Sequence, residues 1–331
     1  QWDIRPKQHY CGRKFFVVIG SSAMRSRVYP EGARAEINET WVEEQGGAVI
    51  EVPSEYWEDF DRDLEGSIRD IAGINTSAIS PYFSRTERIE MCHSTRLFHP
   101  FSVMEYQYGQ PGKFLWDRLV ERKTRKLAGG FTEEYYRPRL NPNHARWVHI
   151  DLALSCDSVG IAVGHVEKMV EVVRRNAEGD EFSDVAPYIV IEFMLRILPP
   201  NGEQIILADV RRLVYELQSR GFPFAGASMD MFQSADSLQQ FRHRGIKSCV
   251  ISVDRTTEPY DNLRSAMYEG RLELYPYGPF ESELMALEYD PQKGKIDHPV
   301  AGSKDVADAA AGVVQGLTEH CRRLPVAAPG P

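Results

Sequence analysis

The sequence predicts an α/β protein built around a mixed five-stranded sheet flanked by helices, with a smaller α/β segment before it. Apolar runs of strand length alternate with amphipathic segments of helical period, which is the pattern of such a fold. The 331 residues are enough for about two domains. The content of 42% hydrophobic and 26% charged residues is ordinary for globular proteins, and no apolar run approaches the length of a membrane span.

The N-terminal part contains two buried strands, which we expect at residues 15–20 and 48–53. The segment between them, residues 32–45, is compatible with a helix. Residues 54–71 are acidic and amphipathic, with aromatic side chains at helical spacing. Residues 75–112 are rich in Ser, Thr, Pro and Gly, so we place the domain boundary between 75 and 145.

The C-terminal part is more regular. The first two strands are joined by a tight turn at 155–158, and Gly221 and Gly245 end the next two helices. Strands are predicted at 147–154, 159–166, 186–197, 222–229 and 246–253, and helices at 203–220, 237–244, 258–270, 279–288 and 303–321. Three antiparallel strands followed by two strands that are joined through helices is the ribonuclease H-like arrangement.

Three elements of this order carry carboxylates that would converge beside the central strands. Asp151 lies in the apolar strand 147–154, where a buried carboxylate is costly unless it is paired. Asp230 ends the fourth strand, and functional groups gather at strand ends in open α/β sheets. Asp305 and Asp308 are three residues apart and share one face of the last helix. Each acid also has an ordinary interpretation, as an exposed strand residue, a loop cap or a first-turn helix acid.

Taken together, these acids indicate a metal-dependent site. The hard oxygen donors of Asp151, Asp230 and Asp305 suit Mg²⁺ or Mn²⁺ rather than zinc, and we include Asp308 among the metal ligands. Two such ions about 3.5–4 Å apart can clamp the attacking and leaving oxygens of a phosphodiester. The reaction that this site implies is hydrolysis by an activated water, without a protein nucleophile.

Other polar residues are weaker candidates for the site. Asp236 is a weaker alternative to Asp230, because it can simply open the following helix. We expect Glu192 to face solvent on an edge strand and His298 to be a loop histidine. The sequence has no phosphate-cradling GxxxxGK[ST] motif, and its five scattered cysteines fit a reducing cytosol better than a disulfide framework or a zinc ribbon.

The charge of the chain is unevenly distributed. The net charge of −9 argues against non-specific coating of nucleic acid by the whole surface. Residues 113–148, however, contain nine Lys and Arg against four Asp and Glu, a local excess of five positive charges. One interpretation is a strip that contacts DNA phosphates through Arg122, Lys123, Arg125 and Lys126. The other is a solvated helix face.

Several segments resemble the nuclease domain of the terminase large subunit of tailed bacteriophages. The stretch from Leu287 through Lys295-Ile296-Asp297-His298-Pro299 to Lys304-Asp305-Val306-Ala307-Asp308 resembles the end of that domain. Residues 229–240 and 149–153 resemble its fourth and first strands, and 52–73 resemble the segment that links motor and nuclease. The resemblance covers residues 48–320 and is strongest over 146–320. Many family members have two adjacent acids where this sequence has Lys304-Asp305.

The resemblance implies a viral DNA-packaging protein that cuts concatemeric double-stranded DNA in the host cytoplasm. It implies a terminase small subunit and a portal as partners, and no membrane. Residues 1–75 would be a remnant of the motor ATPase and its linker, and 76–145 an irregular basic connecting region. Residues 146–322 would be the nuclease domain and 323–331 a flexible tail, with the ATPase motifs absent from this chain.

Two other functions are compatible with the same residues. One is a different ribonuclease H-like phosphotransferase, of the junction resolvase or transposase type. The other is a catalytically dead module that docks on DNA or on the capsid. Cleavage of linear duplex against junction DNA separates the first from a terminase, and Mn²⁺-dependent cleavage separates the second.

Overall fold

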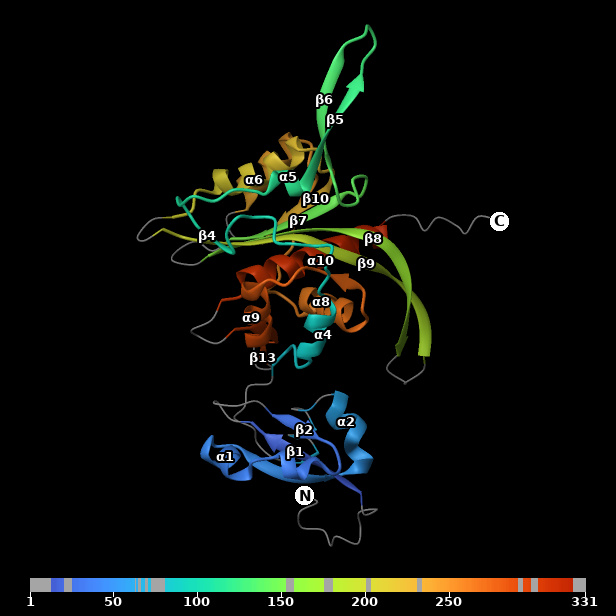
Figure 1. Ribbon diagram of the computed structural model, residues 1–331, viewed down its shortest axis with the longest axis vertical. Coiled ribbons are helices and arrows are strands. Elements are labelled where there is room, and N and C mark those ends of the chain that lie inside the picture. Colours follow the sequence, from blue (N-terminus) through green and yellow to red (C-terminus); the bar gives the residue numbers. More distant parts are fainter. Residues whose placement is uncertain are drawn as a thin grey trace, which may run out of the picture. The chain divides into compact units, whose positions relative to one another are not determined.

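The computed structural model describes residues 13–20, 26–62, 64, 67–68, 71–72, 81–152, 158–175, 181–200, 204–230, 234–290, 294–298 and 303–323. The chain divides into two compact units, residues 1–84 and 85–331 (Figure 1). Most of the turn expected at 155–158 lies outside the described residues, as do residues 324–331 of the expected tail. Parts of the resembling segments, among them 231–233, 291–293 and 299–302, also lie outside them. Among the helices of the described ranges, none combines the length and apolar character that a membrane span requires.

The first unit is a three-stranded antiparallel sheet in the order β2-β1-β3, covered by short helices. Both strands expected from the sequence are confirmed, since β1 spans Lys14–Ile19 and β3 spans Ala48–Pro53. Phe15 and Val17 pack on one side of β1, and Phe16 and Val18 pack on the other. Burial on both sides explains why this strand is a continuous apolar run. The remaining elements are β2 (Arg27–Tyr29), η3 (Ala33–Glu36), α1 (Glu39–Glu44), η4 (Ser54–Tyr56) and α2 (Trp57–Arg62).

The second unit contains a mixed sheet in the order β11-β10-β7-β8-β9-β12, with β4 also paired to β9. Strands β7, β8 and β9 are antiparallel, and β10 and β11 are added parallel to β7. This order confirms the predicted ribonuclease H-like fold. Two short strands beyond the expected five, β4 and β12, extend the sheet outside β9. The strands are β4 (Glu105–Gln107), β7 (Arg146–Asp151), β8 (Val159–Arg175), β9 (Glu181–Leu198), β10 (Phe224–Met229), β11 (Ser248–Val250) and β12 (Leu272–Glu273).

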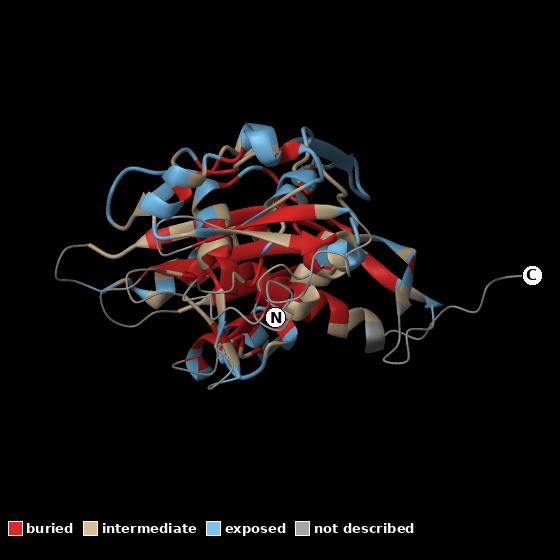
Figure 2. Cartoon of the chain, turned by 90° about the horizontal axis from the view of Figure 1, so that it is seen from below, coloured by how far each residue is buried: buried red, intermediate tan, exposed pale blue. Residues whose placement is uncertain are grey.

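Helices cover both faces of this sheet (Figure 1). Val148 and Ile150 of β7 pack in one core with Val210 and Val214 of α6. On the opposite face, α10 contacts β7, β8 and β9, and α8 contacts α10 in turn. The sheet and α10 are therefore largely buried (Figure 2). The helices are α6 (Leu207–Ser219), α7 (Ala235–His243), α8 (Glu258–Tyr268), α9 (Gly278–Ala286) and α10 (Asp305–Arg323). A small hairpin, β13 (Glu288–Asp290) with β14 (Lys295–Asp297), lies between α9 and α10 in the sequence.

Residues 76–145, expected to be irregular, contain regular structure in their described part. They include α4 (Thr86–Met91), β4, α5 (Trp116–Leu119) and an antiparallel hairpin of β5 (Val120–Lys126) and β6 (Thr132–Pro138). The hairpin projects from the sheet (Figure 1). The interpretation of residues 122–126 as a helix face is therefore wrong, because these residues form a strand.

Candidate active site

A glycine brings the end of β7 and the start of α10 together. Asp151, the last residue of β7, is opposite Gly160 in the ladder with β8. A Cβ atom on Gly160 would lie 1.9 Å from the carbonyl oxygen of Asp305, so the first turn of α10 can lie here only because residue 160 has no side chain. Gly312, two turns further along α10, permits a second close approach, because a Cβ atom there would lie 2.2 Å from the ring of His149. The small residues 309–312 of α10 suit this close approach.

The alternation of β7 directs Asp151 toward this helix. Val148 and Ile150 belong to the core on the α6 face. Successive side chains of a strand point to opposite faces, so His149 and Asp151 share the α10 face. The contact between His149 and Gly312 agrees with this assignment.

The four predicted acids interact electrostatically at Asp151. The pKa of Asp151 is well above its usual range, first because the carboxyl is buried, and then because Asp308 and Asp305 repel its charge. Asp230 raises this pKa as well, whereas Lys304 opposes the rise. Acids from the end of β10 and from the first turn of α10 thus act on the carboxylate at the end of β7.

Hydrogen bonds fix the two helix acids. The Oδ2 atom of Asp305 accepts hydrogen bonds from the hydroxyl of Ser158 and, at 2.7 Å, from that of Ser303. The Oδ1 atom of Asp308 accepts one from the hydroxyl of Tyr260 at 2.5 Å, and burial raises the pKa of Asp308 to about 6. The donor set consists of carboxylate oxygens, which fits Mg²⁺ or Mn²⁺. Within the described ranges, no three His, Cys, Asp or Glu side chains are grouped closely enough to hold a metal ion.

Lys304 and Asp254 join this cluster, although we did not predict either as a site residue. Lys304 is only 8% exposed, and its ammonium pairs with Asp254 and lies 3.2 Å from Oδ2 of Asp308. Burial alone would lower the pKa of Lys304, but the carboxylates of Asp308, Asp254 and Asp297 raise it above its ordinary value. In the sequence, Asp254 comes directly after the predicted fifth strand, just as Asp230 comes directly after the predicted fourth. This position is the signal that could have identified Asp254 as a site residue.

Glu283 of α9 holds the first turn of α10. Its Oε2 atom accepts hydrogen bonds from the backbone N–H groups of Val306 at 2.9 Å and Ala307 at 2.8 Å, and its Oε1 atom lies 3.0 Å from the hydroxyl of Ser303. Two otherwise unpaired N–H groups of the helix N-terminus are thereby satisfied. Burial raises the pKa of Glu283 to about 7. The helical pattern of 279–288 gave no indication of this role.

The prediction that Glu192 faces solvent on an edge strand is wrong. Its side chain is 11% exposed and accepts a hydrogen bond from the Nε atom of the fully buried Arg146 at 2.7 Å. The Nδ1 atom of His165 lies 2.8 Å from the same oxygen, Oε1. Although burial opposes it, His165 and Arg146 hold the pKa of Glu192 below its usual value. The expectation failed because β12 and β4 pair with the outer edge of β9 at 189–190 and 196–198, so β9 is not an edge strand there. The partners of Glu192, Arg146 and His165, also come from other strands.

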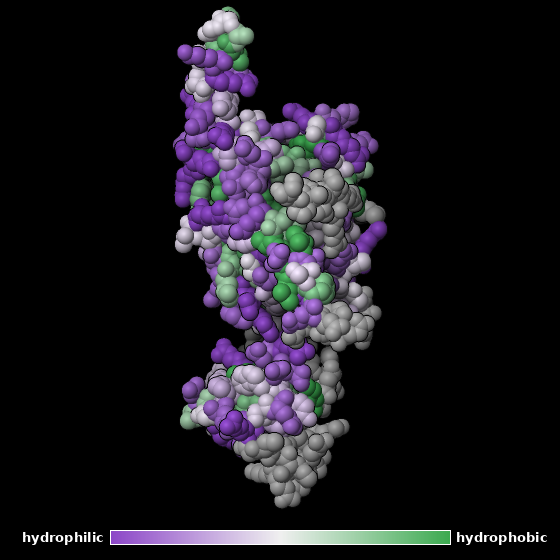
Figure 3. Space-filling model, turned by 90° about the vertical axis from the view of Figure 1, so that its right-hand side faces the viewer, coloured by the Kyte–Doolittle hydropathy of each residue, from purple (hydrophilic) through white to green (hydrophobic). Residues whose placement is uncertain are grey.

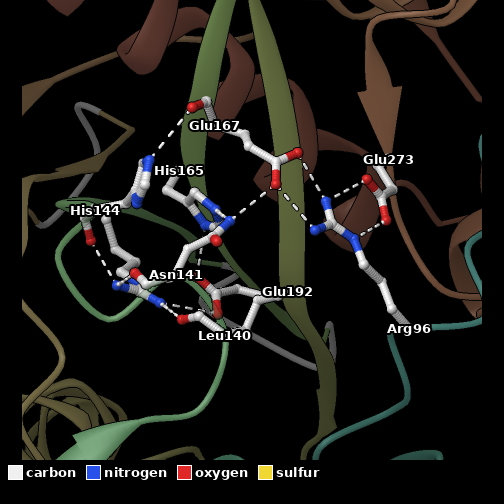
Figure 4. Close-up of polar contacts among 9 residues, drawn as sticks. Arg96, Leu140, Asn141, His144, His165, Glu167, Glu192 and Glu273 are labelled. Atoms are coloured by element: carbon white, nitrogen blue, oxygen red, sulfur yellow. Dashed lines mark hydrogen bonds and ion pairs between the residues drawn. The ribbon is translucent and has the colours of Figure 1, made fainter.

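This buried pair is part of a larger polar network (Figure 4). Arg96 bonds both Glu167 and Glu273, and Asn141 links Glu167 to His165. Arg146 is at the opposite end of β7 from Asp151, so the network is distinct from the acidic cluster. The two weaker candidates have ordinary positions, since Asp236 lies in the first turn of α7 and His298 directly follows β14.

The four basic residues of β5 do not form a one-sided strip. Arg122 and Lys126 are on one face of the hairpin, and Lys123 and Arg125 are on the other. Acids partly neutralise them, because Arg122 pairs with Glu134, Lys123 with Glu121 and Arg125 with Glu133. The hairpin surface is mainly hydrophilic, with apolar residues at its tip, where Phe131 is 73% exposed (Figure 3).

The sequence matches no protein-family model, and no curated protein matches it. Twelve solved chains are similar in structure. The nuclease of the large terminase from thermophilic phage G20c, with bound magnesium, is 14% identical, with a TM-score of 0.39 and coverage of 60% of this chain and 94% of that one. The nuclease domain of the Thermus phage P74-26 large terminase is 14% identical, with a TM-score of 0.38 and coverage of 60% and 90%. The large terminase of bacteriophage HK97 is 13% identical, with a TM-score of 0.39 and coverage of 72% and 44%.

Proposed function

We propose that this chain is a Mg²⁺- or Mn²⁺-dependent endodeoxyribonuclease, the cutting part of a viral genome-packaging terminase. The observation that carries the proposal is the close approach of α10 to Gly160, which is opposite Asp151 and so brings Asp305 and Asp308 beside it. The raised pKa of Asp151, to which its burial and the charges of Asp308, Asp305 and Asp230 contribute, agrees with this arrangement. Such a concentration of negative charge is costly unless a cation compensates it. The resemblance of residues 146–320 to the terminase nuclease indicates the substrate, concatemeric double-stranded DNA.

In this proposal Asp151 is the central ligand, with Asp230 and Asp305 on either side of it. Bound divalent ions would supply Lewis acidity and lower the pKa of the attacking water. In the two-ion form that the sequence predicts, two metal ions would clamp the attacking and leaving oxygens of the phosphodiester. Ser158 and Ser303 orient Asp305, and Glu283 fixes the helix that carries it.

The hairpin β5–β6 is the proposed DNA contact. The major groove of B-DNA admits a two-stranded β-ribbon. Because Arg122 and Lys126 are on one face and Lys123 and Arg125 on the other, a ribbon in the groove would present cations to the phosphates of both strands. The exposed Phe131 at the tip would then contact bases or sugars.

The biological setting is also a proposal. The family resemblance suggests action in the host cytoplasm with a terminase small subunit and a portal. It further suggests that residues 1–75 are a remnant of the ATPase motor and its linker, 76–145 a connecting region, 146–322 the nuclease and 323–331 a tail.

Plasmid cleavage by the Asp151→Asn variant tests the proposal. The loss of metal-binding charge removes several kcal/mol of transition-state stabilisation, so we expect the rate in Mn²⁺ to fall by at least about a thousandfold. Asp236→Asn is the matched control, because Asp236 is 68% exposed and lies outside the acidic cluster. Cleavage by Asp151→Asn at the wild-type rate would contradict the proposal. Wild-type protein that cuts only branched DNA would indicate a junction resolvase, and no Mn²⁺-dependent cleavage would indicate a docking module.

A further inference from the structure

Lys304 places a buried positive charge inside the acidic cluster. Its side chain is 9% exposed, and that of Asp308 is 7% exposed. Removing a lysine from water is expensive, and a buried charge of this kind is tolerated only when oppositely charged groups surround it. Asp254 and Asp308 provide such groups, and Asp151 also interacts with the ammonium.

The same contacts occupy Asp308. One of its carboxylate oxygens, Oδ1, accepts the hydrogen bond from Tyr260, and the other, Oδ2, faces the ammonium of Lys304 at 3.2 Å. Each carboxylate oxygen of Asp308 therefore already has one partner, and a metal ion at Oδ2 would compete with the ammonium of Lys304. In Asp305, by contrast, both serine hydroxyls donate to Oδ2.

We propose that the ammonium of Lys304 is the second positive charge of the active site, and that the site takes a single divalent ion through Asp151, Asp230 and Asp305. This inference rests on the proposed nuclease function. It assigns Asp308 and Asp254 to holding Lys304, so neither is a metal ligand. An ammonium has three N–H donors, and two are directed at these carboxylates. The third would meet a phosphate oxygen, where a fixed positive charge stabilises the transition state.

Calorimetric titration of the metal-free chain with Mn²⁺ tests this directly. We expect wild-type protein to bind a single ion and Lys304→Gln to bind a second one, because Asp308 and Asp254 then lose their resident cation. Lys304→Arg keeps the charge and should still bind a single ion. In chelator, the melting temperature of Lys304→Gln should fall, and Mn²⁺ should raise it more than it raises that of the wild type. Lys14→Gln is the control, since Lys14 forms a lysine–glutamate ion pair in the other unit.

Two results would overturn the inference: wild-type protein that binds two Mn²⁺ ions, or Lys304→Gln that folds and still binds only one. The wild-type stoichiometry decides the question even where Lys304→Gln does not fold. Failure of the proposed function gives a different result. If the wild-type chain binds no Mn²⁺ and cuts no plasmid, the proposed nuclease function is wrong. If it binds two Mn²⁺ ions and cuts plasmid, only the role proposed for Lys304 is wrong.

Discussion

Gly160→Ala should separate the first turn of α10 from the sheet. The added methyl would lie 1.9 Å from the carbonyl oxygen of Asp305 and 2.3 Å from its carbonyl carbon, both rigid backbone atoms. Overpacking a well-packed core costs about 1–3 kcal/mol, and a backbone clash belongs at the upper end of that range. We therefore expect a loss of about 3 kcal/mol in the free energy of unfolding. Because Asp305 moves with the helix, and a displacement of about 1 Å can cost a hundredfold in rate, cleavage should fall by about that factor.

Urea unfolding and plasmid cleavage in Mn²⁺ measure the two effects of Gly160→Ala. Gly278→Ala is the matched control, because a Cβ atom at Gly278, the first residue of α9, meets no atom within 4 Å. This control should keep wild-type stability and activity. If Gly160→Ala were as stable and as active as Gly278→Ala, the close approach of α10 to β8 would not be what positions Asp305.

Three further predictions concern other parts of the molecule. Asp305→Ala should abolish cleavage and Asp308→Ala should reduce it less in the same plasmid assay, and the reverse order would mean that the helix motif is assigned in the wrong register. Replacing Arg122, Lys123, Arg125 and Lys126 by Glu should weaken duplex binding and make its salt dependence shallower, since fewer counterions are released; unchanged binding isotherms would exclude the hairpin as the DNA contact. Burial lowers the pKa of His149 to about 3, so its contribution to stability is complete above about pH 6.5 and is lost toward pH 3 at up to about 1.4 kcal/mol per pH unit. His149→Gln should remove this part of the loss between pH 7 and pH 5, and identical slopes in wild type and variant would show that His149 is not buried in its neutral form.

The strands of the central sheet were predictable because their burial leaves a direct mark on the sequence. Segment 147–154 is nearly all apolar since Val148 and Ile150 face one core and Trp147 and His149 face α10. The small residues 309–312 of α10 permit its close approach to the sheet. Asp230 and Asp305 were predicted as site residues from their places at the ends of elements, and Asp151 from its place within an apolar strand.

The parts that were missed depend on contacts between distant segments. Nothing local to Glu283 shows that it caps α10, because its partners are the N–H groups of residues 306 and 307. Likewise, Lys304 was noted as the place of an absent acid, but its pairing with Asp254 depends on a contact across 50 residues. Strands β4 and β12, which each pair with β9, are too short to produce an alternating pattern, so β9 was wrongly predicted to be an edge strand.

The most direct test of the metal-dependent active site is anomalous diffraction from a crystal of this chain soaked in Mn²⁺. The proposed function predicts a manganese peak bounded by the carboxylates of Asp151, Asp230 and Asp305, with the ammonium of Lys304 still paired to Asp254 and Asp308. A crystal in which the soaked ion binds elsewhere, or in which the acidic cluster gives no anomalous peak, would contradict it.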